Sequence, residues 1–391
     1  MIAPGPFLVD RGFGIAVYEQ AKALRRRGIR VEVVAYHSGR QVPDIPIHRS
    51  APLPGYDATA IGPSLARLPL WILLLHRTLE VARRTRPDVL HGHLHEGALV
   101  ARLVSGLLGI PWVFDFQGSL SLELAEKSSL RPGSLPFRLV SLGERQIDRP
   151  APRILVKSAT MQRDLEDRFG VDPSRIARIM DGTDPDVFSP RPADPVLRRR
   201  WGIGPDAVVV GYLGLLTTQQ GVDRLLEAAD VVLEKRPECH FLVMGYPVDR
   251  ARQLARELGI LSGLTLTGRV DYFTAPDHLA LVDLAVAPKV SRTEGNGKIY
   301  NYMSMGLPVV AIDAPGNREI LGEDGYYARG ASFDHFATAI IEAVRSRDEW
   351  EDRGIRLRRR LEERFTWAAV ASRLVGAYRD VAPGRFDALR D

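Results

Sequence analysis

Short apolar runs rich in β-branched residues alternate with helical patterns along the whole chain, and this alternation is typical of parallel α/β architecture. In the first half the pattern predicts strands over residues 30–36, 88–93, 112–116 and 153–156. Helices are predicted over residues 15–27, 65–85, 98–108 and 159–169. The opening residues 1–4 resemble the end of a first strand, which indicates that this strand is short.

The same alternation begins again after a proline-rich stretch at 189–195, which predicts a linker. The second series predicts strands over residues 207–212, 240–244, 264–267, 284–287 and 309–312. We therefore expect an α/β protein with two Rossmann-like parallel-sheet domains, residues 1–190 and 191–365. A C-terminal helix within 366–391 is expected to pack on either domain and can cross back to the first. Such sheets bind ligands outside the carboxyl ends of their strands, so the site is expected in a cleft between the facing domains.

Composition narrows the class of protein. The chain has 391 residues, of which 45% are hydrophobic and 26% are charged, as is usual for soluble globular proteins. The single cysteine, Cys239, has no partner for an intrachain disulfide, so a cytoplasmic protein is expected. The apolar run 68–75 is far shorter than the roughly 20 residues that span a bilayer. It predicts a core helix, and the alternative is an apolar surface for a lipid acceptor.

The net charge of +5 is concentrated in the first half of the chain. Much of it lies near the end of the first predicted helix, at Lys22, Arg25, Arg26, Arg27 and Arg30. One interpretation is a solvated helix end whose cations interact favourably with the helix dipole. The other is a basic patch on the N-terminal domain that attracts an anionic membrane surface, as in a peripheral protein. No nucleic-acid partner is expected.

A polar, glycine-rich loop precedes the helix that contains Tyr302. Amides at the start of a helix attract anions, and glycine lets the backbone approach them closely. The loop residues Asn296 and Gly297, together with Lys298, are therefore predicted to hold a diphosphate. Glu294 is predicted to accept hydrogen bonds from a ribose or sugar hydroxyl. An ordinary loop and helix cap is the alternative.

Polar side chains also follow two predicted strands of the first half. Spacing of two residues places His91, His93 and His95 on one face at the end of a strand. They are expected to line an acceptor site, with a metal site or structural histidines as alternatives. Asp115 and Gln117 share a face in the same way, and Asp115 is expected to orient or deprotonate the acceptor, with a structural cap as the alternative.

Two further patterns are less specific. Gly12 and Gly14 precede a helix and are expected to present backbone amides to the sugar or the acceptor, unless they only form a tight turn. Asp184 and Asp186 form a DxD pattern, in which two nearby carboxylates can carry a divalent cation. Their position next to Pro185 favours a turn.

Several motifs occur in an order that resembles retaining family 4 of the glycosyltransferases, over nearly all of residues 11–381. They are Gly12-Phe-Gly14, Pro87-Asp-Val-Leu-His91-Gly-His93, Asp181-Gly-Thr-Asp184, Gly221-Val-Asp-Arg-Leu-Leu226 and Lys298-Ile-Tyr-Asn-Tyr-Met303 with Pro308-Val-Val310. The resemblance implies the GT-B fold, a nucleoside-diphosphate sugar donor and retention of anomeric configuration. It also implies that no metal or other cofactor is required. The acceptor is expected to be a glycan, a lipid-linked molecule or a small hydroxylated compound.

The chain departs from this family at four places. The family commonly uses an Arg and a Lys on the departing diphosphate, a His near the sugar and a second Glu on the ribose. Here the corresponding residues are Leu215 after Gly214, then Gln220, Gln117 and Asn301. Losing one preorganised donor typically costs about 10² to 10³ in rate, so Lys298, Lys289 and Arg292 are expected to compensate.

The departures leave two alternatives to an active transferase, a catalytically silent partner subunit and a nucleotide-sugar epimerase on the same scaffold. The expected catalytic residues are His93, Asp115, Gln117 and Glu294. The expected donor-binding residues are Gly12, Gly14, Gly214, Gln220, Lys289, Glu294, Asn296, Gly297, Lys298 and Asn301. The expected acceptor-binding residues are His91, His93, His95 and Gln117.

Overall fold

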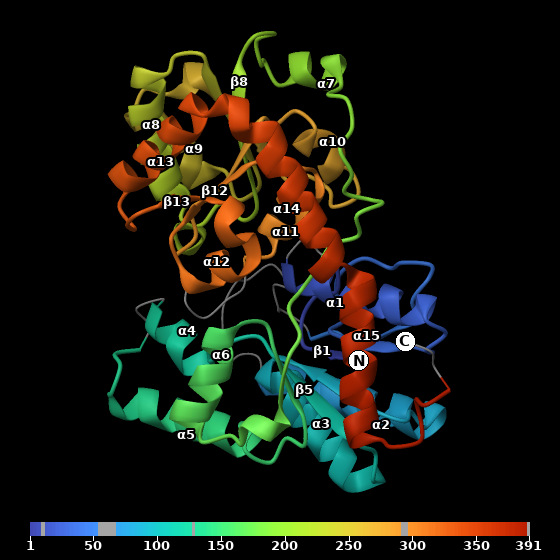
Figure 1. Cartoon of the computed structure of the whole chain (residues 1–391). Coiled ribbons are helices and arrows are strands. Elements are labelled where there is room, and N and C mark those ends of the chain that lie inside the picture. The colour runs from blue at the N-terminus through green and yellow to red at the C-terminus, as the bar shows by residue number, and fades with distance from the viewer. Residues whose placement is uncertain (9–11, 54–67, 127–129, 291–295, 389–391) are drawn as a thin grey trace. The chain divides into compact units, whose positions relative to one another are not determined.

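The computed structural model describes residues 1–8, 12–53, 68–126, 130–290 and 296–388 (Figure 1). Packing divides the chain into two units, and each is described by itself. The first contains Met1–Asp181 and the C-terminal segment that begins at Trp367. The second contains Gly182–Arg292 and Asn296–Thr366. Each unit is built around one parallel sheet.

The sheet of the first unit has seven strands in the order β3-β2-β1-β4-β5-β6-β7. The strands are β1 (Ile2–Ala3), β2 (Val33–Ala35), β3 (Ile47–Arg49), β4 (Leu90–His93), β5 (Trp112–Phe116), β6 (Ile154–Val156) and β7 (Ile176–Arg178). The short first strand is confirmed, and it lies within the sheet, where Ile2 pairs with Val34 on one side and Gly92 on the other.

Helices cover both faces of this sheet. They are α1 (Gly12–Arg26), α2 (Leu68–Thr85), α3 (Leu94–Leu108), α4 (Leu120–Glu126), α5 (Leu135–Asp148), α6 (Ala159–Asp164) and α15 (Trp367–Val381). The short turns Leu165–Phe169 (η2) and Pro173–Arg175 (η3) precede β7. On one face α1 packs against α15, and both contribute to a core with Val113 of β5. On the other face Val104 of α3 packs in a second core with Phe114.

The sheet of the second unit has six strands in the order β10-β9-β8-β11-β12-β13. The strands are β8 (Val208–Leu213), β9 (Cys239–Met244), β10 (Leu264–Gly268), β11 (Leu284–Ala287), β12 (Val309–Ile312) and β13 (Tyr326–Ala328). All their pairings are parallel. Loops that follow β8 and β11 therefore lie at the same edge of the sheet.

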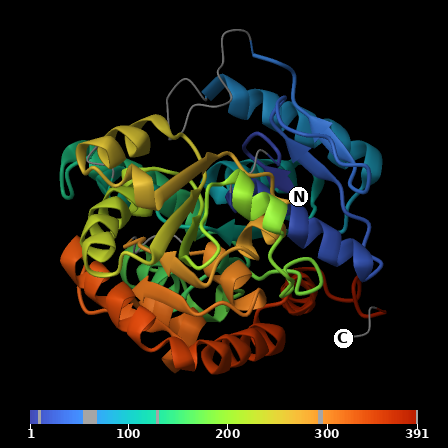
Figure 2. The same ribbon diagram turned by 90° about the horizontal axis from the view of Figure 1, so that it is seen from above.

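Figure 2 shows helices around the strands of this second sheet. They are α7 (Pro195–Arg200), α8 (Val222–Lys235), α9 (Asp249–Glu257), α10 (Ala275–Leu279), α11 (Lys298–Ser304), α12 (Pro315–Leu321), α13 (Phe333–Arg345) and α14 (Trp350–Arg364). Single turns occur at Thr218–Gln220 (η4), Leu261–Gly263 (η5), Gly322–Asp324 (η6) and Arg347–Glu349 (η7). Helices α8 and α13 pack side by side, and α11 packs against α14.

The sequence predicts the long elements well. The bounds of β5, β11 and β12 agree with the predicted ones, and α15 lies within the predicted range 366–391. The prediction for α3 is wrong at its start, because the helix begins at Leu94 and not at Ala98. Three strands that the sequence analysis does not identify, β3, β7 and β13, each have three residues and lie at sheet edges. Such segments are too short to show a period of two residues.

Helix α2 contains the whole apolar run 68–75. Leu70 and Leu74 are fully buried, whereas Ile72 is 67% exposed. The run therefore forms part of the core, as the preferred interpretation predicts. Within the described part of the chain, no helix has the length and apolar character needed to cross a bilayer.

Gly92 lies where the backbones of β4 and α3 pack closely, and this contact generates a stability prediction. A Cβ atom at Gly92 would lie 2.6 Å from the carbonyl oxygen of Gly97 and 2.7 Å from the Cα of Ala98. Gly92→Ala should therefore push α3 away from the strand and lower the free energy of unfolding by about 1–3 kcal/mol.

Gly106, on α3, provides the matched control, because a Cβ there meets nothing within 4 Å. Gly106→Ala should raise the stability by about 0.5–1 kcal/mol, since alanine is the better helix former. Urea unfolding followed by circular dichroism measures both effects. Equal midpoints for the two variants would contradict the packing described here.

Candidate functional site

Four polar side chains meet at the carboxyl ends of three strands in the first unit, and we call them the first-unit cluster. His91 and His93 belong to β4, Asp115 belongs to β5, and Lys157 directly follows β6. The Nδ1 of His93 lies 3.0 Å from Oδ2 of Asp115, its paired residue on the next strand. The Nζ of Lys157 lies 3.3 Å from the same oxygen. The rings of His91 and His93 stack with centroids 4.1 Å apart.

Two further side chains tie this cluster to other elements. The Nδ1 of His91 forms a 2.8 Å hydrogen bond with the hydroxyl of Tyr378, on α15. The Nζ of Lys157 lies 3.0 Å from Oδ1 of Asp181, which follows β7 and is 26% exposed. The cluster therefore connects β4, β5, β6, the segment after β7 and the C-terminal helix.

The charges in the cluster follow from burial and proximity. Burial opposes ionisation of Asp115, but the charge of Lys157 and hydrogen bonds from both histidines outweigh it, so the pKa of Asp115 lies well below its usual range. Burial also opposes the charge on Lys157, but Asp115 and Asp181 raise its pKa above the ordinary value. Burial lowers the pKa of His91 to about 3 and lowers that of His93. An ionised Asp–Lys pair thus lies beside two neutral imidazoles.

Exposure separates the predicted catalytic residues of this unit. His93 and Asp115 are fully buried, whereas Gln117 is half-buried. The side-chain amide of Gln117 donates to Oδ2 of Asp115 at 3.4 Å, which confirms that these two side chains share a face. Gln117 is therefore positioned by the cluster, while His93 and Asp115 have no exposed surface. His93 Nε2 and Asp115 Oδ1 are buried and have no hydrogen-bond partner among the described residues.

The cluster has the composition of a metal site, with ligand atoms of His91, His93 and Asp115 within 4.8 Å of one another. The ammonium of Lys157, 3.3 Å from the carboxylate, would repel a metal cation bound there. The arrangement fits a buried ion pair better than a metal centre.

The expectation that His95 shares a face with His91 and His93 is wrong. The strand ends at His93, Leu94 has a positive φ of 57°, and α3 begins at that residue. His95 therefore packs against Phe114 and Phe116, on the opposite face from Asp115, and its Nε2 lies 3.2 Å from Oδ1 of Asp148. The alternation of a strand does not continue across the start of a helix.

A second group of predicted residues meets at the carboxyl edge of the second unit's sheet, and we call it the second-unit cluster. The Nζ of Lys298, the first residue of α11, donates to Oε1 of Gln220 at 3.0 Å and to Oδ1 of Asn296 at 3.4 Å. The ammonium also lies 5.0 Å from the ring centroid of Tyr212. The structure thus brings Lys298, Gln220 and Asn296 together, as the sequence predicts.

The backbone around Gly214 makes room for this lysine. Gly214 directly follows β8 and has a φ of 153°. A Cβ there would lie 2.9 Å from Cε of Lys298 and 3.0 Å from the hydroxyl of Tyr212. Tyr302 fixes α11 to the same strand, because its hydroxyl accepts a 2.8 Å hydrogen bond from the amide of Leu213. Gly214 therefore takes part in the second-unit cluster through its missing side chain.

The other predicted donor-binding residues of the second unit lie nearby in the chain but have other contacts. Asn301 accepts a 2.8 Å hydrogen bond from the hydroxyl of Thr183. Lys289 follows β11 by two residues and is buried. Gly297 caps α11 and is exposed. Glu294 and Arg292 lie outside the described residues.

The two glycines predicted to bind the donor, Gly12 and Gly14, lie in the first turn of α1. Gly12 is exposed and Gly14 is buried. A Cβ at Gly14 would lie 2.9 Å from the amide nitrogen of Leu8, so close chain packing accounts for this glycine. The DxD pattern forms a turn, in which Oδ1 of Asp184 accepts a 3.2 Å hydrogen bond from the amide of Asp186.

Sequence reasoning missed Lys157 and Tyr378 and gave Asp181 no role. A lysine directly after an apolar strand was the available signal for Lys157, because strand ends carry ligand-binding side chains in such sheets. Tyr378 is 287 residues from its partner His91, a separation that no local pattern can show.

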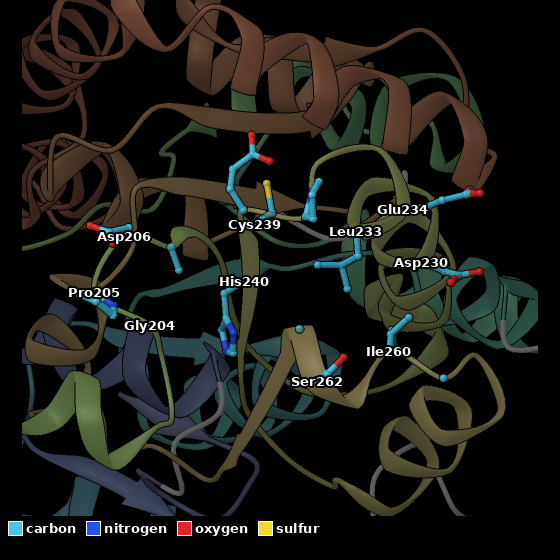
Figure 3. A pocket seen from close by; sticks show the side chains of 15 residues that line it. Gly204, Pro205, Asp206, Asp230, Leu233, Glu234, Cys239, His240, Ile260 and Ser262 are labelled. Atoms are coloured by element: carbon cyan, nitrogen blue, oxygen red, sulfur yellow. The ribbon is translucent and has the colours of Figure 1, made fainter.

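A hollow of about 660 Å³ lies in the second unit, at the amino ends of β8 and β9 (Figure 3). Cys239, His240, Ile260 and Ser262 are among its lining residues. The second-unit cluster lies at the opposite edge of the same sheet, so this hollow contains none of the predicted site residues. His240 is already hydrogen-bonded to the hydroxyl of Thr265 at 2.8 Å.

The buried neutral His91 generates a prediction for the pH dependence of stability. Its pKa of about 3 lies below that of an unfolded histidine, so only the unfolded chain gains a proton at this position as the pH falls below about 6.5. The free energy of unfolding should therefore decrease below that pH, by up to about 1.4 kcal/mol per pH unit from this residue, and gain nothing above it.

His91→Gln removes the titrating group and keeps a hydrogen-bonding side chain beside Tyr378. Its urea-unfolding midpoint should therefore depend less steeply on pH than that of the wild type between about pH 6.5 and 4. Parallel pH profiles for the two proteins would show that His91 is not held neutral by the fold.

Comparison with known proteins shows which family this chain belongs to. Residues 11–182 match the family model described as glycosyl transferase 4-like domain, and residues 207–346 match the model described as glycosyl transferases group 1. A protein of Geodermatophilus obscurus named D-inositol 3-phosphate glycosyltransferase is 29% identical and aligns with 94% of this chain and 84% of its own length. A protein of the same name from Rhodococcus erythropolis is 27% identical, over 95% of this chain and 87% of its own.

Solved structures of low sequence identity share the fold. The sucrose-phosphate synthase of Thermosynechococcus elongatus superposes with a TM-score of 0.79 at 17% identity, over 97% of this chain and 98% of that one. HepE of Anabaena, solved in complex with UDP-glucose, gives a TM-score of 0.75 at 18% identity, over 96% and 98% of the two chains. The chain therefore belongs to the group 1 glycosyltransferases of family 4, which transfer a sugar from a nucleotide sugar, and it has the GT-B fold.

Proposed function

We propose that this protein is a retaining, metal-independent hexosyltransferase whose donor is a nucleoside-diphosphate sugar, with uridine as the first base to test. The second-unit cluster carries this proposal, because it fixes the ammonium of Lys298 beside the start of α11. The uridine nucleotide is suggested by HepE, which shares the fold and was solved with UDP-glucose.

On the donor side, Lys298 would replace the basic residues that the family commonly uses. A departing diphosphate gains negative charge, and a preorganised cation stabilises it most. The carbonyl oxygens of Gln220 and Asn296 hold the ammonium in one place, and Gly214 leaves room for its side chain. The two departures at Leu215 and Gln220 are therefore compatible with an active donor site.

On the acceptor side, the first-unit cluster would orient a hydroxyl group through Gln117. The side chain of Gln117 is tied to Asp115, which Lys157 keeps ionised. Behind it, His93 Nε2 and Asp115 Oδ1 are two buried atoms that can still accept hydrogen bonds. The relatives named D-inositol 3-phosphate glycosyltransferase make that phosphorylated polyol the first acceptor to test, ahead of glycans and lipid-linked acceptors.

The same departures support a second candidate, a catalytically silent partner subunit that binds a nucleotide sugar without transferring it. Leu215 carries no charge and Gln220 is neutral, and together they remove two cations that family members commonly use. Measurement of transfer separates the two candidates.

The central test incubates the purified protein with UDP-sugars and D-inositol 3-phosphate, with and without EDTA, and follows the products by NMR. We expect a glycoside with the anomeric configuration of the donor, formed at the same rate in EDTA. Recovery of activity only after metal addition would contradict the metal-free mechanism. An epimerised donor with its diphosphate still attached would show that the protein catalyses a different reaction. If the protein binds the nucleotide but neither transfers the sugar to any class of acceptor nor hydrolyses the donor, the silent subunit would be supported.

Lys298→Ala tests the donor site alone. Loss of a hydrogen bond to a charged group costs about 1.5–3 kcal/mol, so the Kd for UDP should rise by about 10- to 100-fold in titration calorimetry. Lys235→Ala, at the exposed end of α8 in the same unit, is the matched control and should leave the Kd unchanged. Equal affinity for UDP in the Lys298 variant and the wild type would remove this lysine from the donor site.

A further inference from the structure

Helix α5 carries a row of exposed leucines, which we call the leucine stripe. Leu135, Leu139 and Leu142 are 71%, 60% and 52% exposed. Their spacing of four and three residues places them on one side of the helix. Exposed apolar residues are usually scattered singly, so three in a row call for an explanation. The helix lies at the outside of the first unit (Figure 1).

The charges of α5 divide between its two sides. Arg138 and Arg145 are exposed, as is Arg149 at the C-terminal cap, and their spacing places them in a row along one flank of the leucine stripe. The two carboxylates, Glu144 and Asp148, are buried on the opposite side. The outward side of α5 is therefore apolar and basic, with no acidic residue of the helix on it.

Contacts of the buried carboxylates fix this orientation. The carboxylate of Glu144 accepts hydrogen bonds from the amide of Leu120 and the hydroxyl of Ser121, both at 2.5 Å. Oδ1 of Asp148 lies 3.2 Å from Nε2 of His95. Rotating α5 to bury its leucines would break these bonds and leave their polar partners in the core unpaired. The leucine stripe therefore stays on the outside.

The arginine row is also held in place. A guanidinium nitrogen of Arg145 donates to the carbonyl of Arg168 at 2.6 Å, and that of Arg149 donates to the carbonyl of Phe169 at 2.8 Å. These acceptors are neutral, so the bonds position the two guanidinium groups without cancelling their charges. Each group retains further N–H donors for an anionic partner.

The neighbouring helix α3 also has exposed leucines. Helix α3 packs against α5, and the guanidinium of its Arg102 donates to the carbonyl of Gln146. Leu103 and Leu107 on α3 are 45% and 65% exposed. Both helices of this pair therefore present leucines and arginines to the outside.

We propose that α5 docks the protein on a membrane surface that contains anionic lipid. The leucine stripe would enter the boundary between headgroups and acyl chains, and Arg138, Arg145 and Arg149 would pair with lipid phosphates. A helix with leucines on its outer side and basic residues beside them is suited to lie in that interface. Each arginine near an anionic surface adds to the attraction.

The charge pattern favours a membrane over a second copy of the chain. In a two-fold dimer the same patch meets itself, so no acidic residue of α5 would pair with the arginines, and in an antiparallel arrangement the two arginine rows would lie side by side. The basic segment at the end of α1 is a weaker docking candidate, because carboxylates offset two of its charges. Lys22 donates to Glu19 at 3.4 Å, and Arg30 donates to Glu32 at 2.7 Å.

The test is flotation of the full chain with lipid vesicles, which needs no substrate and so does not depend on the proposed transfer reaction. We expect binding to vesicles that mix phosphatidylcholine with phosphatidylglycerol, and little binding to phosphatidylcholine alone. Leu135→Gln and Leu139→Gln should each weaken binding by about tenfold or more, because each removes a leucine from the buried apolar surface. Arg138→Gln should weaken binding to anionic vesicles and reduce its sensitivity to salt.

Ile355→Gln provides the matched control, since Ile355 is 60% exposed on α14 of the second unit. It should bind vesicles like the wild type, and unchanged urea midpoints in all variants would show that the fold is intact. Wild-type binding by the two leucine variants would overturn the proposal, and so would equal binding to neutral and anionic vesicles. The proposal would also be overturned if the wild type did not bind vesicles and instead formed a dimer that Leu139→Gln dissociates.

Discussion

The ion pair between Asp115 and Lys157 is the interaction on which the first unit's site depends. Burying two charges is costly, and removing either partner leaves the other uncompensated, with a typical penalty of about 3–5 kcal/mol. Here the pair lies 3.3 Å apart at the ends of β5 and β6, and it also touches His93 and Asp181. The charge on Lys157 thus keeps Asp115 an acceptor, which fixes the tautomer of His93 and the position of Gln117. Lys157 thus sets the ionisation of Asp115, whereas burial keeps the two imidazoles neutral.

In the second unit a lysine is also held in one position, but by neutral side chains and not by a carboxylate. The side-chain amide oxygens of Gln220 and Asn296 orient Lys298, and the lysine side chain fits there because Gly214 has no side chain. The departure at Gln220 therefore changes what the residue does. A lysine there would place two ammonium groups together, whereas glutamine supplies an acceptor for the one that remains. The departure at Gln220 is thus matched to Lys298, which supports the donor site proposed above.

Much of this could be predicted from sequence, and the failures have physical causes. The α/β class, two sheets and the second-unit cluster follow from alternating patterns and from motifs near strand ends. His95 was misplaced because a positive φ at Leu94 changes strand to helix within one residue. Tyr378 was missed because tertiary packing brings it to the site from a distant part of the chain. Lys157 was missed although its position directly after β6 was a local signal. Individual roles of the site residues, and the cleft expected between the domains, stay predictions.

Helix α5 and the segment that carries Gln117 are mechanically joined. Glu144, on the inner side of α5, holds the hydroxyl of Ser119 and the amide of Leu120, within three residues of Gln117. Opening of either segment by local unfolding would break the same set of hydrogen bonds, so the two should exchange their amide hydrogens as one cooperative region. Any contact that immobilises the outer surface of α5 would then also reduce the motion of the loop at the end of β5.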